Sequence, residues 1–183
     1  MLELVDKRDL KSFEPKVRAG SIPAPGTVEN NIRIVDFKPQ YKQAFIEINE
    51  AWISKDYVLE ELDKKELYNP EENILRGGGA ILIALSNGEP VGTCALVNAG
   101  NHTYELIKMA VTEKARGLKI GRLLGIKTIA KAKSLGAKKI ILYSNTKFSG
   151  IAVQLYYKLG FKKVPLGNTE WQRADIKMEL ELS

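Results

Sequence analysis

The segment 109–124, MAVTEKARGLKIGRLL, constrains the fold more than any other part of the chain. Its apolar residues end a strand at Val111, a polar turn follows, and a helix opens within RGLKIGR. The first turn of a helix has unpaired backbone N–H groups at the positive end of the helix dipole. The turn therefore predicts a phosphate-binding site. Positive side chains surround it: Arg116, Lys119 and Arg122.

Charge is distributed unevenly along the 183 residues, whose net charge is +6. Residues 111–163 carry a net charge of +12, and residues 56–72 carry −5. This separation favours two ligands of opposite sign on one domain, although solvated helix faces would give the same pattern. The acids of the negative segment are Asp56, Glu60, Glu61, Asp63, Glu66, Glu71 and Glu72.

Several classes of protein are disfavoured by composition. The longest purely aliphatic run, 80–85, is too short to span a bilayer. Charged residues at 6–9 interrupt any signal-peptide core. The single cysteine, Cys94, excludes intramolecular disulfides and lies in an apolar strand, where we expect a core residue. Together these features predict a cytoplasmic protein without membrane association.

Prolines and glycines interrupt residues 1–30, so we expect an N-terminal arm or linker there and a single domain over 31–183. Within the domain, apolar periodicity and turn residues predict the elements. The expected strands span 32–37, 80–85, 91–97, 102–111, 138–143, 161–164 and 173–182. The expected helices span 41–53, 58–67, 119–135 and 150–159, with a short turn capped by Asn69 before Pro70.

Three sequence pieces occur together in this order: the strand–turn–helix, the strand end YSNT at 143–146, and LYYKLGF at 155–161. The combination resembles the GNAT superfamily of acyl-CoA-dependent N-acetyltransferases over roughly residues 32–182. Ala110-Val111 followed by RGLKIG at 116–121 matches the pyrophosphate loop of that family. One departure is Lys119, which stands where the family loop usually has glycine. A lysine there either obstructs the approach of a phosphate or supplies a charged contact in its place.

The resemblance implies an α/β (α+β) fold with a mixed, mostly antiparallel central sheet, helices on both faces, and a splayed parallel strand pair that holds acetyl-CoA. It implies a bulge in the strand before the loop, with backbone contacts to the pantetheine arm. No metal is implied. The cofactor-binding residues expected from it are Met109, Ala110, Val111, Arg116, Gly117, Leu118, Lys119, Ile120, Gly121, Arg122 and Asn145.

The same resemblance implies two catalytic side chains. Glu105 matches the strand position of a general base, and Tyr156 matches the tyrosine that protonates the departing thiolate. A backbone N–H at Met109 or Val111 would polarise the thioester oxygen. For each side chain a structural alternative stays open: Glu105 as a solvated strand-start residue, and Tyr156 as a packing aromatic. Lys108, in the middle of an apolar strand, has no assigned role; one interpretation is that it faces the cleft.

We therefore expect a single N-acetyltransferase domain that moves an acetyl group from acetyl-CoA to a primary amine by direct attack in a ternary complex. A cationic amine would be attracted to the acidic segment 56–72. A catalytically silent acyl-CoA sensor and a basic nucleic-acid-binding module are the alternatives. The basic half has no interleaved aromatics and no helix-turn-helix or zinc spacing, which disfavours the second. A homodimer stays open.

Overall fold

The structure is a computed structural model that describes residues 31–182. Residues 1–30, the expected arm or linker, lie outside this range. The strands are β1 (Ile32–Asp36), β2 (Ala80–Ser86), β3 (Glu89–Asn98), β4 (Thr103–Val111), β5 (Lys139–Ser144), β6 (Lys162–Val164) and β7 (Ile176–Glu181). The helices are η1 (Pro39–Tyr41), α2 (Lys42–Asp56), α3 (Glu61–Tyr68), η2 (Glu71–Leu75), η3 (Glu113–Ala115), α4 (Ile120–Ser134) and α5 (Gly150–Lys158).

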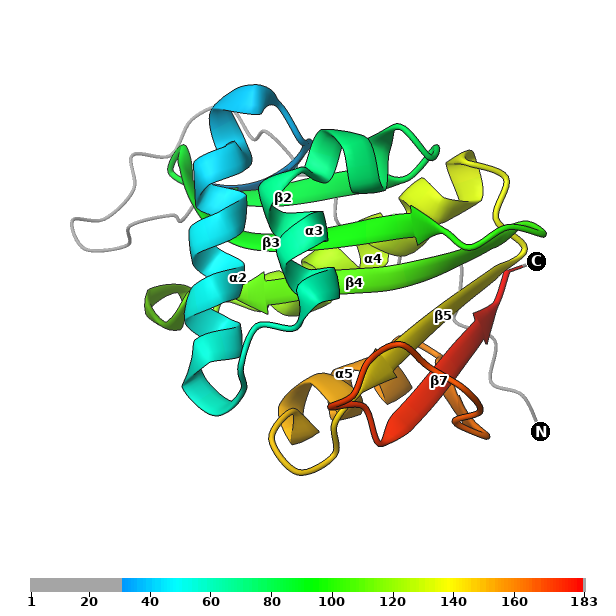
Figure 1. The fold of residues 1–183 in the computed structure, drawn as a ribbon. Coiled ribbons are helices and arrows are strands. Elements are labelled where there is room, and N and C mark those ends of the chain that lie inside the picture. The colour runs from blue at the N-terminus through cyan, green and yellow to red at the C-terminus, as the bar shows by residue number, and fades with distance from the viewer. Residues whose placement is uncertain (1–30, 183) are drawn as a thin grey trace, which may run out of the picture.

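All seven strands form one sheet in the order β1-β2-β3-β4-β5-β7-β6. Every neighbouring pair is antiparallel except β4 and β5. The parallel pairing is short, because it joins only residues 103–105 of β4 to residues 139–141 of β5. Beyond it the two strands diverge, and Figure 1 shows β5 and β7 turning away from β4. The sheet therefore opens between these strands.

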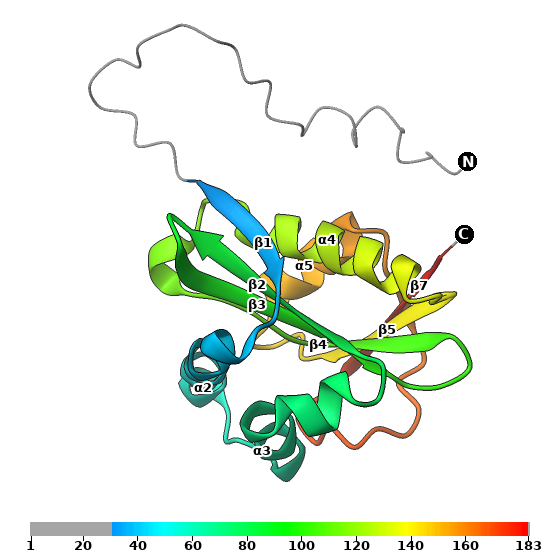
Figure 2. The same cartoon turned by 90° about the horizontal axis from the view of Figure 1, so that it is seen from above.

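Helices cover both faces of the sheet: α2 and α3 lie on one side, and α4 and α5 on the other (Figure 2). Each face has its own apolar core, and β2 contributes to both. Leu82 and Ala84 pack on the α4 side, whereas Ile81 and Ile83 pack on the α2 side. Because successive strand residues point to opposite faces, a strand covered on both sides is apolar throughout. The predicted fold, a mostly antiparallel sheet with helices on both faces and a splayed parallel pair, is confirmed.

Some predicted boundaries were wrong. Helix α3 begins at Glu61 and not at 58, because Glu60 and Asp63 form a reciprocal capping box that fixes the start of the helix. Asn69 does not cap the next turn; it ends α3, and Pro70 precedes the π-helical turn η2. Over residues 31–182, no helix is long and apolar enough to cross a membrane.

Candidate active site

The diverging strands enclose a cleft whose wall comes from every layer of the fold. Residues 105–109 of β4 form one side and residues 143–145 at the end of β5 form the other. The remaining lining side chains come from α2 and the turn after it, from α5 and the residues before it, and from the segment before β7: Asn49, Trp52, Ile53, Tyr57, Ser149, Ala152, Tyr156, Trp171, Arg173 and Ala174. Catalytic side chains predicted from the sequence, Glu105 and Tyr156, are therefore brought to one cavity.

The predicted phosphate turn lies between η3 and α4. Gly117 and Lys119 both have left-handed backbone conformations, with φ of 82° and 57°. This geometry leaves the N–H groups of Gly117 to Arg122 without a hydrogen-bond acceptor within residues 31–182, and no side chain caps the helix. A Cβ at Gly117 would meet nothing within 4 Å. The turn is thus an open row of donors at the positive end of a fifteen-residue helix.

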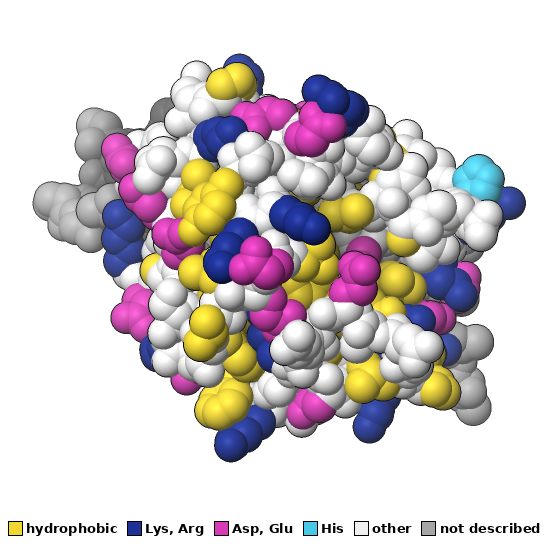
Figure 3. Space-filling model, viewed as in Figure 1, with side chains coloured by type: hydrophobic (Ala, Val, Ile, Leu, Met, Phe, Trp, Pro, Cys, Tyr) yellow, Lys and Arg dark blue, Asp and Glu magenta, His cyan; other side chains and the backbone are white. Residues whose placement is uncertain are grey.

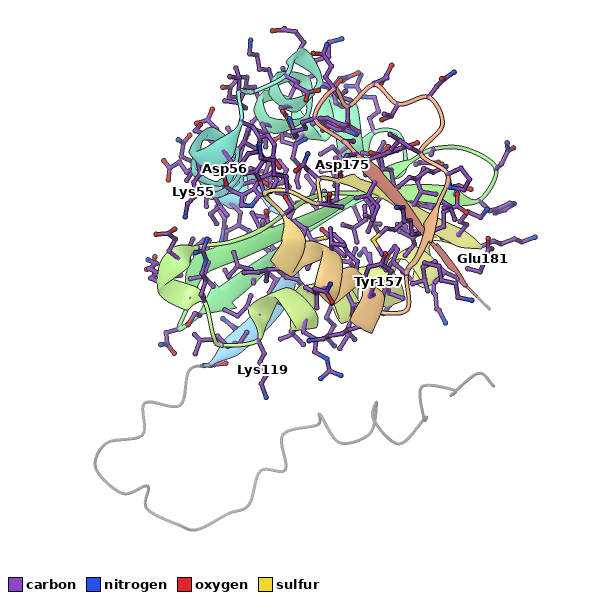
Figure 4. The ribbon with its side chains drawn as sticks, turned by 90° about the horizontal axis from the view of Figure 1, so that it is seen from below. Lys55, Asp56, Lys119, Tyr157, Asp175 and Glu181 are labelled. Carbon is purple, nitrogen blue, oxygen red and sulfur yellow. The ribbon has the colours of Figure 1, made fainter. Side chains whose placement is uncertain are left out.

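Lys119 adopts the conformation for which glycine is usually chosen, since an L-residue at positive φ is strained. The backbone conformation of the loop is thus one that glycine would adopt freely. Figure 4 shows the Lys119 side chain projecting outward from the start of α4. The lysine therefore extends away from the turn and leaves its backbone donors open. Lys119 is also the N-cap of α4, so this helix begins one residue later than predicted.

Strand β4 carries the bulge that the resemblance implies. Its register with β3 shifts between the pairs Thr93–Ala110 and Ala95–Ile107. Lys108 and Met109 therefore lie opposite the single residue Cys94, and Lys108 has a φ of 50°. A bulge of this kind locally re-aims the backbone of its strand. Here it does so at the wall of the cleft, since both bulged residues line it.

Glu105 lies on β4 at the last residue of the parallel pairing. It is half-buried, and its carboxylate accepts a hydrogen bond of 2.8 Å from Nε1 of Trp171. Burial raises the pKa of Glu105, although the Trp171 hydrogen bond and the charge of Lys108 oppose this shift. The residue is therefore a partly desolvated carboxylate in the cleft and not a freely solvated strand-start residue.

Tyr156 is buried on α5, where its ring makes an edge contact with Phe161 at a centroid distance of 5.9 Å. Burial raises the pKa of its phenol above the usual range, and the nearby Cys94 adds to the shift. Tyr156 packs in the core and also lines the cleft, so its packing and catalytic interpretations are compatible. Its neighbour Tyr157 is exposed on the surface of α5 (Figure 4).

Asn145 lines the cleft, but its side chain is already engaged. Its Oδ1 accepts hydrogen bonds from the N–H groups of Lys147 and Phe148, and its Nδ2 donates to the carbonyl of Arg173. The residue ties the loop after β5 to the segment before β7. Any cofactor contact by Asn145 would be added to this structural role.

A buried charged network is present that was not predicted from the sequence. Lys108 Nζ donates to Asp63 at 2.9 Å and also to Glu66, and both nitrogens at the fork of Arg173 donate to Asp63 at 2.6 and 2.9 Å. The side chains of Lys108, Asp63 and Glu66 are only 4%, 0% and 7% exposed. Lys108 also lies over the ring of Trp171, 4.6 Å from its centroid. The lysine therefore joins the bulge to α3 at the edge of the cleft.

The two acids of this network respond differently to burial. For Asp63 the burial penalty is outweighed by Arg173 and Lys108, so its pKa is lowered. For Glu66 burial prevails over Lys108, and its pKa is raised. Two signals in the sequence pointed to the network: a lysine inside an apolar strand, and two acids three residues apart, which share one face of a helix.

The acidic segment 56–72 does not form a uniform negative surface. Six of its seven acids have a basic partner within 4 Å, and Figure 3 shows acidic and basic side chains interspersed over the face with α2 and α3. The partnered acids are Glu60, Glu61, Asp63, Glu66, Glu71 and Glu72. Attraction of a cationic acceptor by this segment stays a prediction, but reversing the charge of Asp63 would disrupt the core and would not test it.

A sequence model described as the acetyltransferase (GNAT) family matches residues 43–161. No curated protein matches the chain. A similar solved structure is an acetyltransferase of the GNAT family from Staphylococcus aureus Mu50, with 27% identity and a TM-score of 0.72 over 83% of this chain and 99% of that chain. An acetyltransferase from Streptococcus agalactiae has 20% identity and a TM-score of 0.73 over 82% and 98%. A Salmonella typhimurium protein, solved with its cofactor acetyl-CoA, has 20% identity and a TM-score of 0.65 over 84% and 95%.

Proposed function

The chain belongs to the acetyltransferase (GNAT) family, and we propose that it moves an acetyl group from acetyl-CoA to a primary amine by direct attack in a ternary complex. One observation carries the proposal: a row of unpaired N–H groups at the start of α4 and a cleft lined by Glu105 and Tyr156 occur in the same fold. The first is a site for phosphate, and the second holds an acid and a base.

The open turn fits a diphosphate. No Cβ at Gly117 and no side-chain cap on α4 obstructs the N–H groups, and the segment that carries them also contains Arg116 and Arg122. The structure of the Salmonella typhimurium relative contains acetyl-CoA, which supports the same ligand here. We assign the diphosphate to the N–H groups of Gly117 to Arg122, and the pantetheine arm to the cleft beside Met109, Ala110 and Val111. Bound acetyl-CoA would supply a thioester carbonyl to the acceptor.

Glu105 is the proposed general base. An alkyl ammonium has a pKa of about 10.4 and must lose a proton before its nitrogen can attack. Burial raises the pKa of Glu105, which makes its carboxylate a stronger base than an exposed glutamate. Glu105 accepts the proton that the ammonium loses before attack, directly or through water, and releases it to solvent before the next cycle. Once the new N–C bond has formed, the nitrogen loses its second proton to water. The negative charge of the Glu105 carboxylate in the cleft also favours a cationic acceptor.

Tyr156 is the proposed general acid. When the C–S bond breaks, the electron pair stays on sulfur, and the phenol of Tyr156 supplies the proton that makes the free thiol. The phenol is protonated at neutral pH and so holds a proton for the departing thiolate, although burial, which raises its pKa, makes it a weaker acid than an exposed tyrosine. Tyr156 regains a proton from water before the next cycle.

Direct transfer is favoured over an acyl-enzyme because the single cysteine is unsuited to attack. Cys94 is fully buried in β3, and burial raises the pKa of its thiol to about 12. A thiol in this state is not a nucleophile at neutral pH. A lone unpaired cysteine also fits a reducing compartment, and we propose the cytoplasm.

A thiol-release assay tests this function. The protein is mixed with acetyl-CoA and a panel of primary amines that includes polyamines, amino acids and peptides with free N-termini, and free coenzyme A is measured. We expect amine-dependent release that falls in Glu105→Gln and Tyr156→Phe. Calorimetry with acetyl-CoA runs in parallel. Tight binding without release for any amine would favour the silent sensor, and the absence of binding would contradict the proposal.

A further inference from the structure

A chain of buried hydrogen bonds connects α2 to the bulge of β4. Asn49 Nδ2 donates to the carbonyl of Phe45 at 2.8 Å and to Oγ1 of Thr93 at 3.0 Å. The Thr93 hydroxyl in turn donates to the carbonyl of Lys108 at 2.8 Å. Asn49 and Thr93 are 1% and 0% exposed. We call this chain the bulge clamp.

We propose that Asn49 and Thr93 are positioning residues, which fix the peptide between Lys108 and Met109 so that the Met109 N–H faces the thioester oxygen. This inference rests on the proposed acetyl transfer and goes beyond it, since it names the side chains that hold the backbone donor in place.

The bulge needs such support because its backbone is strained. Lys108 has a φ of 50°, which a non-glycine residue keeps only when its surroundings hold it there. Two independent anchors do so. The carbonyl of Lys108 is held by Thr93, and its ammonium is held by Asp63 and Glu66. Helices α2 and α3 thus fix the same residue through different groups.

The direction of the Met109 N–H follows from peptide geometry. In a planar trans peptide the C=O and the following N–H point in opposite directions. Because the carbonyl of Lys108 points at the Thr93 hydroxyl, the N–H of Met109 points away from it. Parallel pairing of β4 with β5 ends at Glu105, so β5 offers no acceptor opposite Met109, which lines the cleft. The donor is therefore available to a bound oxygen.

The Asn49 side chain acts in the clamp through its amide nitrogen, Nδ2, and not through its oxygen. Its Oδ1 is buried and has no hydrogen-bond partner within residues 31–182, which costs free energy. Both hydrogen bonds of the side chain are made by Nδ2. A buried asparagine that leaves its oxygen unpaired is explained if the position serves to orient Thr93.

The test compares Thr93→Val, which removes the hydroxyl, with Thr93→Ser, which keeps it. Loss of an oxyanion donor typically lowers kcat by about 10²–10³-fold, and a donor that is merely released from its clamp should cost roughly tenfold or more. We expect Thr93→Val to lower kcat roughly tenfold or more, while the KM for acetyl-CoA changes less than about threefold. Thr93→Ser, which keeps the hydroxyl, should retain most of kcat. Asn49→Ala should resemble Thr93→Val. The matched control is Thr128→Val on α4, another fully buried threonine, which lies outside the clamp.

A second readout does not depend on activity. The Met109 amide resonance in ¹⁵N-labelled protein should move in Thr93→Val and Asn49→Ala and stay near its original position in Thr93→Ser and Thr128→Val. An unmoved Met109 amide, or a kcat loss in Thr93→Val no larger than in Thr128→Val, would overturn the clamp. If the parent protein transfers no acetyl group, the proposed function fails and the amide resonance still decides the clamp. If Thr93→Val does not fold, Asn49→Ala decides by the same two readouts.

Discussion

Replacing Lys108 with methionine tests the buried charged network. Lys108→Met leaves Asp63 with both hydrogen bonds from Arg173, but it leaves Glu66 without any basic partner among residues 31–182. Breaking a buried ion pair by removing one partner costs about 3–5 kcal/mol. Because only one of the two carboxylates loses its basic partner, we expect the free energy of unfolding to fall by about 3 kcal/mol at neutral pH. For a chain of 183 residues this lowers Tm by roughly 6–12 °C.

The loss of stability in Lys108→Met should depend on pH, because a buried Glu66 without a basic partner can become neutral by binding a proton. Its pKa in the folded protein is already raised by burial and would rise further without Lys108. A carboxyl whose pKa is higher in the folded than in the unfolded state binds more protons when folded, so stability falls as the pH rises through that interval. Lys108→Met should therefore be more destabilising at pH 8 than at pH 5.

Thermal unfolding followed by circular dichroism at both pH values measures the effect. Lys55→Met is the control, because it breaks an exposed pair with Glu113 and should cost about 1 kcal/mol or less. Adding Glu66→Gln to Lys108→Met removes the unpaired charge. The double variant should recover at least about half of the lost stability, and its stability should no longer depend on pH in this way. Equal losses for Lys108→Met and Lys55→Met, or no recovery in the double variant, would refute the reasoning.

Three other predictions concern the turn and the cleft. Lys119→Ile should lower the free energy of unfolding by about 1–2 kcal/mol in urea, because a β-branched residue is strained at a φ of 57°, whereas Lys119→Gly should leave it within about 1 kcal/mol. The pH profile of kcat/KM should rise through a pKa above the ordinary glutamate value, because burial raises the pKa of Glu105, and this limb should disappear in Glu105→Gln with activity down about 10²–10⁴-fold. Tyr156→Phe should lower kcat about 10²-fold without changing the Kd for acetyl-CoA measured by calorimetry, and an unchanged kcat would leave Tyr156 a packing residue only.

Local sequence patterns predicted most of the fold. Asn87 and Gly88 form the turn between β2 and β3 with positive φ, 52° and 90°, and an Asn-Gly pair between two apolar segments is a local signal for such a hairpin. Gly136 ends α4 with a φ of 80°, as a C-terminal glycine should. Such features depend on a few neighbouring residues, so they can be inferred from the order of the chain alone.

Features that depend on distant contacts were not predictable in this way. The predicted helix begins at Val58, yet this residue is 85% exposed before the capping box that starts α3. Lys108 and its partners Asp63 and Glu66 are separated by more than 40 residues, so local patterns do not show that the two acids are buried against this lysine. The bulge clamp is equally distant in sequence, since Asn49 and Thr93 are 44 residues apart.

Titration of ¹⁵N-labelled protein with coenzyme A tests the central claim most directly, because it reports on each backbone donor separately. We predict that the largest amide shifts occur from Gly117 to Arg122, where the N–H groups are unpaired, with further shifts along residues 109–111 of β4. Saturating coenzyme A that leaves the amides of 117–122 unmoved would contradict it.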